Sequence, residues 1–246
     1  MKLSEIVGRY FATRKCASCG ELLPYESRRE ALCPKCRIGW DKAKANECKR
    51  CGRAVFECSC MSSALAGAGA IVHHKLVIYS VKDTAVRNTV MFIKKNNNPR
   101  VAHFLAEQLL STLVSDVELS ALDEREALIT FVPRSKKGRI CYGFDQSELI
   151  AAELGKLMGI EARRSIRRVK EGKEQKKLGA RARIKNAKTL YAPIADLESI
   201  VSGKRIILVD DIVTTGASMS ACISYLVRAR AREVICLSVA IAEDDK

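Results

Sequence analysis

The chain alternates, from residue 71 onward, between short apolar runs and segments with helical spacing. The apolar, β-rich runs lie at 71–81, 127–132, 205–210 and 233–240, and helical spacing or capping signals mark 86–93, a helix from 99, 145–159 and 217–229. A capping Asn98 precedes Pro99, and Asp145 and Glu148 form a capping box. Strands and helices in this order predict an α/β fold, a mostly parallel sheet covered by flanking helices, over residues 71–246.

The first sixty residues show a cysteine pattern instead. Eight of the eleven cysteines precede residue 61 and form four closely spaced pairs: Cys16 and Cys19, Cys33 and Cys36, Cys48 and Cys51, and Cys58 and Cys60. Each pair brackets a short loop of the kind that a tetrahedral thiolate site needs. Gly20 and Gly52 directly follow a cysteine, where a tight turn around a metal requires unusual backbone angles. We expect two Zn²⁺ ions in a small N-terminal double zinc ribbon, residues 1–62.

Two alternatives bear on these cysteines. A disulfide framework of this density is typical of exported chains, but no apolar signal segment follows Met1, so we expect zinc and a cytoplasmic location. The ligands can be paired sequentially, residues 16–36 for one ion and 48–60 for the other, or interleaved in a cross-brace. Sequential pairing is topologically simpler and is the one we expect. The small-residue segment 61–70 predicts a linker to the second domain.

The segment around residue 210 carries the most specific chemistry in the chain. The apolar run 206–209 leads into Asp210 and Asp211, and five residues that suit a phosphate cradle follow, with hydroxyls and backbone N–H groups at a helix start: Thr214, Thr215, Gly216, Ala217 and Ser218. The turn between a strand and a helix is where open α/β sheets bind ligands. Two carboxylates suit vicinal sugar hydroxyls, directly or through Mg²⁺. Helix capping alone would explain one aspartate and leave the other at a buried strand end.

This segment resembles the 5-phosphoribosyl 1-diphosphate (PRPP) motif of type I phosphoribosyltransferases. The resemblance implies that Asp210 and Asp211 hold the ribose hydroxyls and that 214–218 wraps the 5-phosphate, with Mg²⁺ accompanying PRPP. It also implies a pyrophosphate-facing loop at 133–138, where Arg134, Lys136 and Lys137 would neutralise the diphosphate.

Two further segments narrow the resemblance to the competence protein ComF family, which joins a double zinc ribbon to a type I phosphoribosyltransferase domain. They are Tyr142-Gly143-Phe144-Asp145-Gln146, and the later stretch with Arg168, Gln175, Leu178, Arg183 and Asn186. Tyr142 stands where the family usually shows arginine, and Asp145 where it shows asparagine. Together with the cysteines and the PRPP motif, the resemblance covers nearly the whole chain.

Charge is concentrated in one part of the sequence. The formal net charge is +15, and 134–188 contains seventeen Lys or Arg against six Asp or Glu. Such a segment favours polyanions, and the ribbon also threads basic residues among Tyr25, Trp40 and Phe56, as a nucleic-acid surface does. A solubilising surface is the alternative interpretation of the ribbon charges.

Three functions fit these observations. The resemblance favours a competence factor of natural transformation that handles incoming single-stranded DNA, works with proteins of the DNA-uptake machinery and binds PRPP or a related phosphosugar. The second is an active phosphoribosyltransferase of nucleotide salvage or synthesis, and the third is a PRPP sensor without turnover. The sequence contains no apolar stretch long enough to span a bilayer.

Overall fold

The fold has a four-stranded parallel sheet at its centre. The computed structural model describes residues 14–114, 125–170, 187 and 189–242. Strands β3 (Val72–Tyr79), β8 (Glu233–Ala242), β7 (Arg205–Val213) and β4 (Ala127–Phe131) lie side by side in that order, and each neighbouring pair is parallel. The predicted α/β fold is therefore confirmed. Strand β7 is longer than expected, since it runs through Asp210 and Asp211 to Val213.

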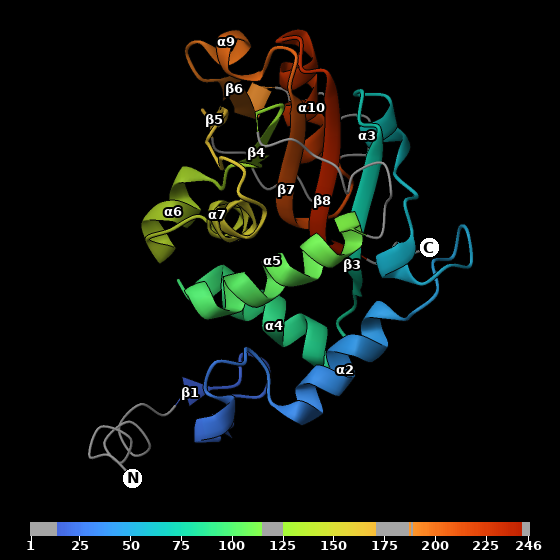
Figure 1. The fold of residues 1–246 in the computed structure, drawn as a ribbon, viewed down its shortest axis with the longest axis vertical. Coiled ribbons are helices and arrows are strands. Elements are labelled where there is room, and N and C mark those ends of the chain that lie inside the picture. The colour runs from blue at the N-terminus through green and yellow to red at the C-terminus, as the bar shows by residue number, and fades with distance from the viewer. Residues whose placement is uncertain (1–13, 115–124, 171–186, 188, 243–246) are drawn as a thin grey trace.

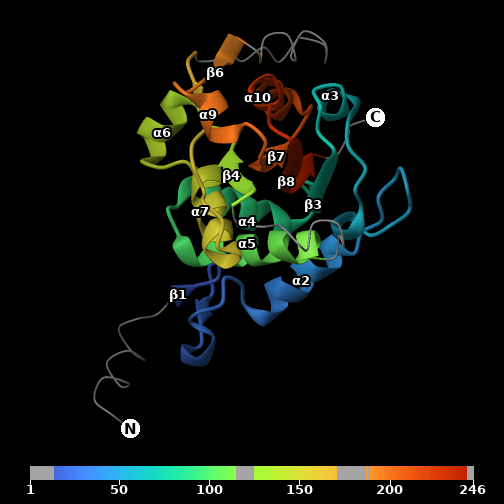
Figure 2. The ribbon, with the colours of Figure 1, turned by 45° about the horizontal axis from the view of Figure 1, so that its top comes forward.

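Helices cover both faces of this sheet (Figures 1 and 2). The α4 (Thr84–Lys95), α5 (Pro99–Val114) and α7 (Gln146–Met158) helices pack on one face, and α3 (Ser63–Ala66), α9 (Leu197–Val201) and α10 (Ala217–Arg228) on the other. Alternate residues of a strand point to opposite faces, so Ile207 and Val209 of β7 enter the first core, and Ile206 and Leu208 enter the second. A central strand buried on both faces explains the unbroken apolar run.

The helix signals in the sequence correspond to caps in the structure. The Oδ1 atom of Asn98 accepts a hydrogen bond from the Val101 backbone N–H at 3.2 Å. Asp145 precedes α7 and accepts from the Ser147 backbone N–H, also at 3.2 Å. At the other end of α7, Gly159 adopts φ 69°, a left-handed conformation that glycine takes without strain.

The cysteine-rich part packs against the α4 and α5 helices (Figure 1). It contains β1 (Arg14–Lys15), β2 (Leu22–Leu23), α2 (Pro34–Lys44) and the 3-10 turns η1 (Tyr25–Ser27) and η2 (Val55–Glu57). Trp40 of α2 has no exposed surface, and its ring meets Phe104 of α5 edge-on, with centroids 5.6 Å apart. The ribbon and the α/β part thus share one hydrophobic core.

Several elements lacked a signal in the sequence. The expected linker contains α3, whose Leu65 is fully buried on the α10 side of the sheet. A helix, α6 (Lys136–Tyr142), begins inside the expected pyrophosphate loop. The β5 (Ile166–Arg168) and β6 (Tyr191–Pro193) strands form an antiparallel hairpin. Gln175, Leu178, Arg183 and Asn186 lie outside the described residues. In the described ranges, no helix is long and apolar enough to cross a bilayer.

Candidate functional site

The turn between β7 and α10 encloses a small cavity. Asp210 and residues 212–219 line it, including Thr214, Thr215, Gly216, Ala217 and Ser218, and its volume is about 70 Å³. Gly216 has φ 73°, and a Cβ atom there would lie 3.1 Å from the Ser62 Oγ. Glycine therefore serves two needs, the left-handed turn and the close approach of the segment before α3. The structure brings the predicted phosphate loop and Asp210 together.

Asp210 is buried beside a second carboxylate. Its Oδ1 accepts hydrogen bonds from the Ser147 Oγ at 3.2 Å and from the Asp211 backbone N–H at 2.9 Å. Burial raises the pKa of Asp210 well above its ordinary value, and the charge of Asp211 raises it further. A cation or a hydroxyl donor in the cavity would relieve this cost, which suits a sugar or a metal ligand.

Asp211 has partners from two helices. Its Oδ2 accepts from the Gln146 Nε2 of α7 at 3.1 Å and lies 3.3 Å from the Lys94 Nζ of α4. Its Oδ1 accepts from the Ile212 backbone N–H at 2.7 Å. Asp211 does not line the small cavity, so the two aspartates face different surroundings. Lys94 could not be predicted from the sequence, because a contact between α4 and β7 depends on the tertiary fold.

The β5–β6 hairpin lies next to the start of α10. Arg168 donates from Nη1 to the Tyr191 hydroxyl at 3.4 Å, and the Tyr225 hydroxyl of α10 donates to the Tyr191 carbonyl at 3.0 Å. Burial raises the pKa of Tyr191, and a hydrogen bond with Ser218 opposes that shift. Arg168 is therefore near the phosphate loop.

The expected pyrophosphate residues lie apart from this cavity. Lys136 and Lys137 are exposed in the first turn of α6, after the helix cap Ser135, whose Oγ accepts from the Gly138 backbone N–H. The Arg134 guanidinium stacks over Tyr142, 4.3 Å from its ring centroid. Lys136 also lines a separate cavity of about 390 Å³ between α6 and α7.

Asp145 connects that loop to α7. In addition to capping the helix, its carboxylate accepts from the Arg134 backbone N–H at 2.7 Å. Burial raises the pKa of Asp145, and the bond from Arg134 opposes that shift. Asp145 and Tyr142, the two departures from the ComF pattern, both contact Arg134 and fix the loop.

The eight N-terminal cysteines form two groups of four. In each group all sulfur atoms lie within 4.8 Å of one another: Cys16, Cys19, Cys33 and Cys36 in one, and Cys48, Cys51, Cys58 and Cys60 in the other. This is the sequential arrangement, and each group could hold a zinc ion. The Cys33 backbone N–H donates to the Cys16 Sγ and the Cys60 N–H to the Cys58 Sγ, each at 3.3 Å.

Burial and hydrogen bonds shift the pKa values of these thiols in opposite directions. Burial opposes the charge on Cys16, but hydrogen bonds from Cys19 and Cys33 outweigh it and lower its pKa to about 7. Burial and the neighbouring sulfurs raise the pKa of Cys36 to about 12. Four adjacent thiols cannot all ionise without a counter-charge, and a divalent metal supplies one.

Comparison with known proteins agrees with the phosphoribosyltransferase class that the parallel sheet and the phosphate loop indicate. The family described as phosphoribosyl transferase domain matches residues 147–246. The DNA utilization protein YhgH of Salmonella typhimurium is 26% identical over 87% of this chain and 84% of its own length. YhgH of Escherichia coli K12 is 27% identical over 59% of this chain, which spans 63% of that relative.

A solved structure of the allosteric regulatory enzyme of purine biosynthesis aligns with 61% of this chain and 30% of its own, at 20% identity and a TM-score of 0.36. The family match and the similarity to the YhgH relatives support a ComF-like phosphoribosyltransferase.

Proposed function

We propose that this protein is a ComF-type competence protein. It handles single-stranded DNA during natural transformation, in the cytoplasm, while its α/β domain binds PRPP with Mg²⁺. The relatives named for DNA utilization and the match to the phosphoribosyl transferase domain support the two halves of this proposal. The ribbon and the basic segment 134–188 would contact DNA. Proteins of the uptake machinery would be partners.

One observation supports PRPP binding. The buried carboxylate of Asp210 lines the same cavity as the loop that turns at Gly216 and leads into α10. Backbone N–H groups and hydroxyls of 214–218 would bind the 5-phosphate, and Asp210 would accept from the ribose. For Asp211 to serve the ribose as well, its oxygens must be shared with Lys94 and Gln146. The positive charges of Arg134, Lys136 and Lys137 would attract the diphosphate from outside the cavity.

Two metals belong to this proposal. The two cysteine groups would each bind one Zn²⁺ and supply folding free energy to the ribbon. Asp210 and Asp211 would hold Mg²⁺, which would neutralise negative charge on the diphosphate.

The PRPP half is tested by thermal shift. Mg²⁺-PRPP should raise the melting temperature of the wild-type protein, since a ligand that binds only the folded state stabilises it. The double variant D210A/D211A should lose this shift. The matched control D41A/D196A removes two exposed aspartates and should keep it. An unchanged shift in D210A/D211A would refute the site.

The DNA half is tested by binding of labelled single-stranded DNA to zinc-loaded protein over a salt series. Affinity should fall steeply as salt increases, because phosphate contacts release counterions. Absence of binding at low salt would favour the alternative, a small-molecule phosphoribosyltransferase. Pyrophosphate release from PRPP then separates an active transferase from a sensor.

A further inference from the structure

Four arginines line one cavity at the junction of the ribbon and the α/β part. The cavity has a volume of about 310 Å³ and is lined by Arg14 of β1, Arg28 and Arg29 after η1, and Arg100 of α5. Residues more than seventy positions apart in sequence contribute guanidinium groups to one space. This arginine cleft shares no residue with the Asp210 cavity.

Backbone contacts hold the cleft in shape without neutralising it. Arg100 donates from Nη1 to the Glu30 carbonyl and from Nη2, at 2.9 Å, to the Lys15 carbonyl. Among the described residues, its buried Nε has no hydrogen-bond partner. Arg28 lies over the Tyr25 ring at 3.8 Å. Carbonyl partners and an aromatic face fix guanidinium groups but leave their charge unpaired.

The accumulated charge is costly without an anion. Burial lowers the pKa of Arg100, and the charge of Arg14 lowers it further, against the opposing charges of Cys16 and Glu30. Within the described part of the chain, none of the four forms an ion pair with a carboxylate, whereas Arg37, Arg164 and Arg205 each do. Like charges gathered in one cleft repel each other, and bound phosphate removes that repulsion.

We propose that the arginine cleft binds the phosphates of single-stranded DNA. This deepens the proposed function by placing DNA on residues of the ribbon and α5. Several guanidinium groups around an open cleft suit a chain of phosphates, and the half-buried Tyr25 ring beside Arg28 offers a surface for a base. Lys15 and Glu30, which anchor Arg100, lie close in sequence to Cys16 and Cys33. Metal binding by the first cysteine group would therefore hold the cleft together.

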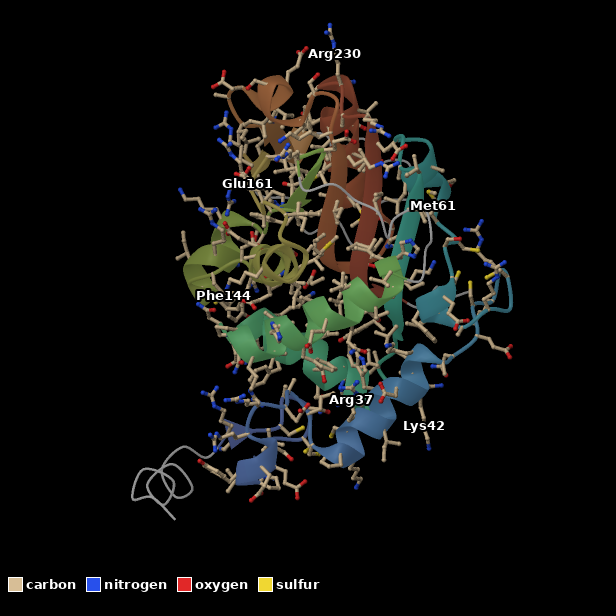
Figure 3. The ribbon with its side chains drawn as sticks, in the orientation of Figure 1. Arg37, Lys42, Met61, Phe144, Glu161 and Arg230 are labelled. Carbon is tan, nitrogen blue, oxygen red and sulfur yellow. The ribbon has the colours of Figure 1, made fainter. Side chains whose placement is uncertain are left out.

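The test compares two triple variants that remove equal charge. R14Q/R28Q/R29Q opens the cleft and keeps Arg100, whose bonds support the fold. The control R228Q/R230Q/R232Q removes three arginines at the opposite end of the molecule, where Figure 3 shows Arg230. The probe is labelled oligo(dT), measured by anisotropy between low and moderate salt. The charge-preserving variant R14K/R28K/R29K controls for folding, together with zinc content and circular dichroism.

The cleft variant should bind oligo(dT) at least about tenfold more weakly, and the slope of log K against log[salt] should fall by about 2, the value for three lost contacts to a single strand. The control should stay within about threefold of the wild type because its arginines lie away from the cleft, and the lysine variant because it keeps the three positive charges. Equal weakening in the cleft and control variants would overturn the proposal, because only net charge would then matter.

Failure of the cleft is distinguishable from failure of the proposed function. Wild-type binding that the cleft variant retains would refute the cleft alone. Absence of wild-type binding would refute both. Inorganic pyrophosphate could instead stabilise the wild type but not the cleft variant, while both bind oligo(dT) equally. That result would assign the cleft to a small anion and overturn the DNA proposal. The Mg²⁺-PRPP shift should be unchanged in every one of these variants, because the cleft and the Asp210 cavity are separate.

Discussion

At the residue scale, Asp210 is a group whose burial opposes stability. Its folded pKa lies above the unfolded value, so its contribution to stability is present at low pH and is lost as pH rises through the folded pKa. An asparagine at position 210 would keep the acceptor oxygen for the Ser147 hydroxyl and for the Asp211 backbone N–H. We therefore expect D210N to stabilise the ligand-free protein at pH 8 by about 1 kcal/mol, a rise in melting temperature of roughly 2–4 °C.

The same variant should lose stabilisation by Mg²⁺-PRPP, so stability and binding would change in opposite directions. Calorimetry with and without ligand measures both. The outcome that would contradict this account is a lowered melting temperature of ligand-free D210N at pH 8.

The buried His73 should make the stability of the fold depend on pH in the acid range. It is buried in β3, where its Nε2 lies 2.8 Å from the Ser238 Oγ. Burial lowers the pKa of His73 to about 3, and the charge of Lys75 lowers it further. Because the folded pKa is below the unfolded value near 6.5, stability is complete above pH 6.5 and falls toward pH 3.

We expect the wild type to lose up to about 1.4 kcal/mol per pH unit from this residue below pH 6.5. H73Q should lose less stability between pH 7.5 and 5.5, measured by urea unfolding with zinc in excess. Parallel pH profiles for the two proteins would show that His73 is not responsible.

At the element scale, α4 connects the ribbon to the candidate site. Asn88 donates from Nδ2 to the Ser18 carbonyl in the first cysteine loop at 3.0 Å, and Lys94, further along the helix, reaches Asp211. K94M would leave the Asp211 carboxylate buried without its cation. We expect a loss of about 1–3 kcal/mol, because Lys94 is partly exposed and the full cost of an unpaired buried charge does not apply.

A double-mutant cycle makes this prediction specific. D211N should reduce the cost of K94M, with a coupling of about 1 kcal/mol from urea unfolding. K95M changes the neighbouring exposed lysine and should be nearly neutral. If the effects of K94M and D211N on stability are strictly additive, the ion pair between Lys94 and Asp211 does not contribute to stability.

The elements predicted from the sequence share a physical property that the missed ones lack. The strands and long helices of the sheet bury whole apolar faces, so their periodicity is visible in the residues. The β5 strand has only three residues, two of them arginines, and α6 contains Gly138 among basic residues. Their positions depend on contacts such as that of Arg134 with Tyr142, which no local pattern encodes.

The residues of the candidate site likewise include some that could be predicted from the sequence and others that could not. The acidic pair and the loop 214–218 are contiguous, so their order between a strand and the following helix could be predicted, although β7 extends past both aspartates to Val213. Gln146 and Lys94 reach Asp211 from distant helices, and the direction of the Arg134 side chain depends on the aromatic rings of α6 and its neighbouring loop. Tertiary contacts of this kind become visible only in the folded structure.

At the scale of the whole molecule, the shared core makes the ribbon a structural part of the α/β domain. Trp40, the one tryptophan of the chain, is fully buried against Phe104, and Cys16 and Cys33 belong to the same apolar cluster. If the first cysteine group holds zinc, removing it would unpack that cluster. We expect a strong chelator to shift Trp40 fluorescence to the red and to lower the melting temperature of the α/β part together with that of the ribbon.

Serine variants separate the two metal groups. C16S/C19S should reproduce the Trp40 shift without chelator, because Cys16 belongs to the Trp40 cluster and both residues belong to the first cysteine group. C48S/C51S should leave Trp40 largely unchanged. The second group lies instead beside the buried Lys75, which donates to the Cys60 carbonyl, and leads into the segment that contacts Gly216. Its loss should therefore weaken the Mg²⁺-PRPP shift. Chelated protein with an unchanged α/β transition and unchanged Trp40 emission would mean that the ribbon folds independently of the core that it shares in this structure.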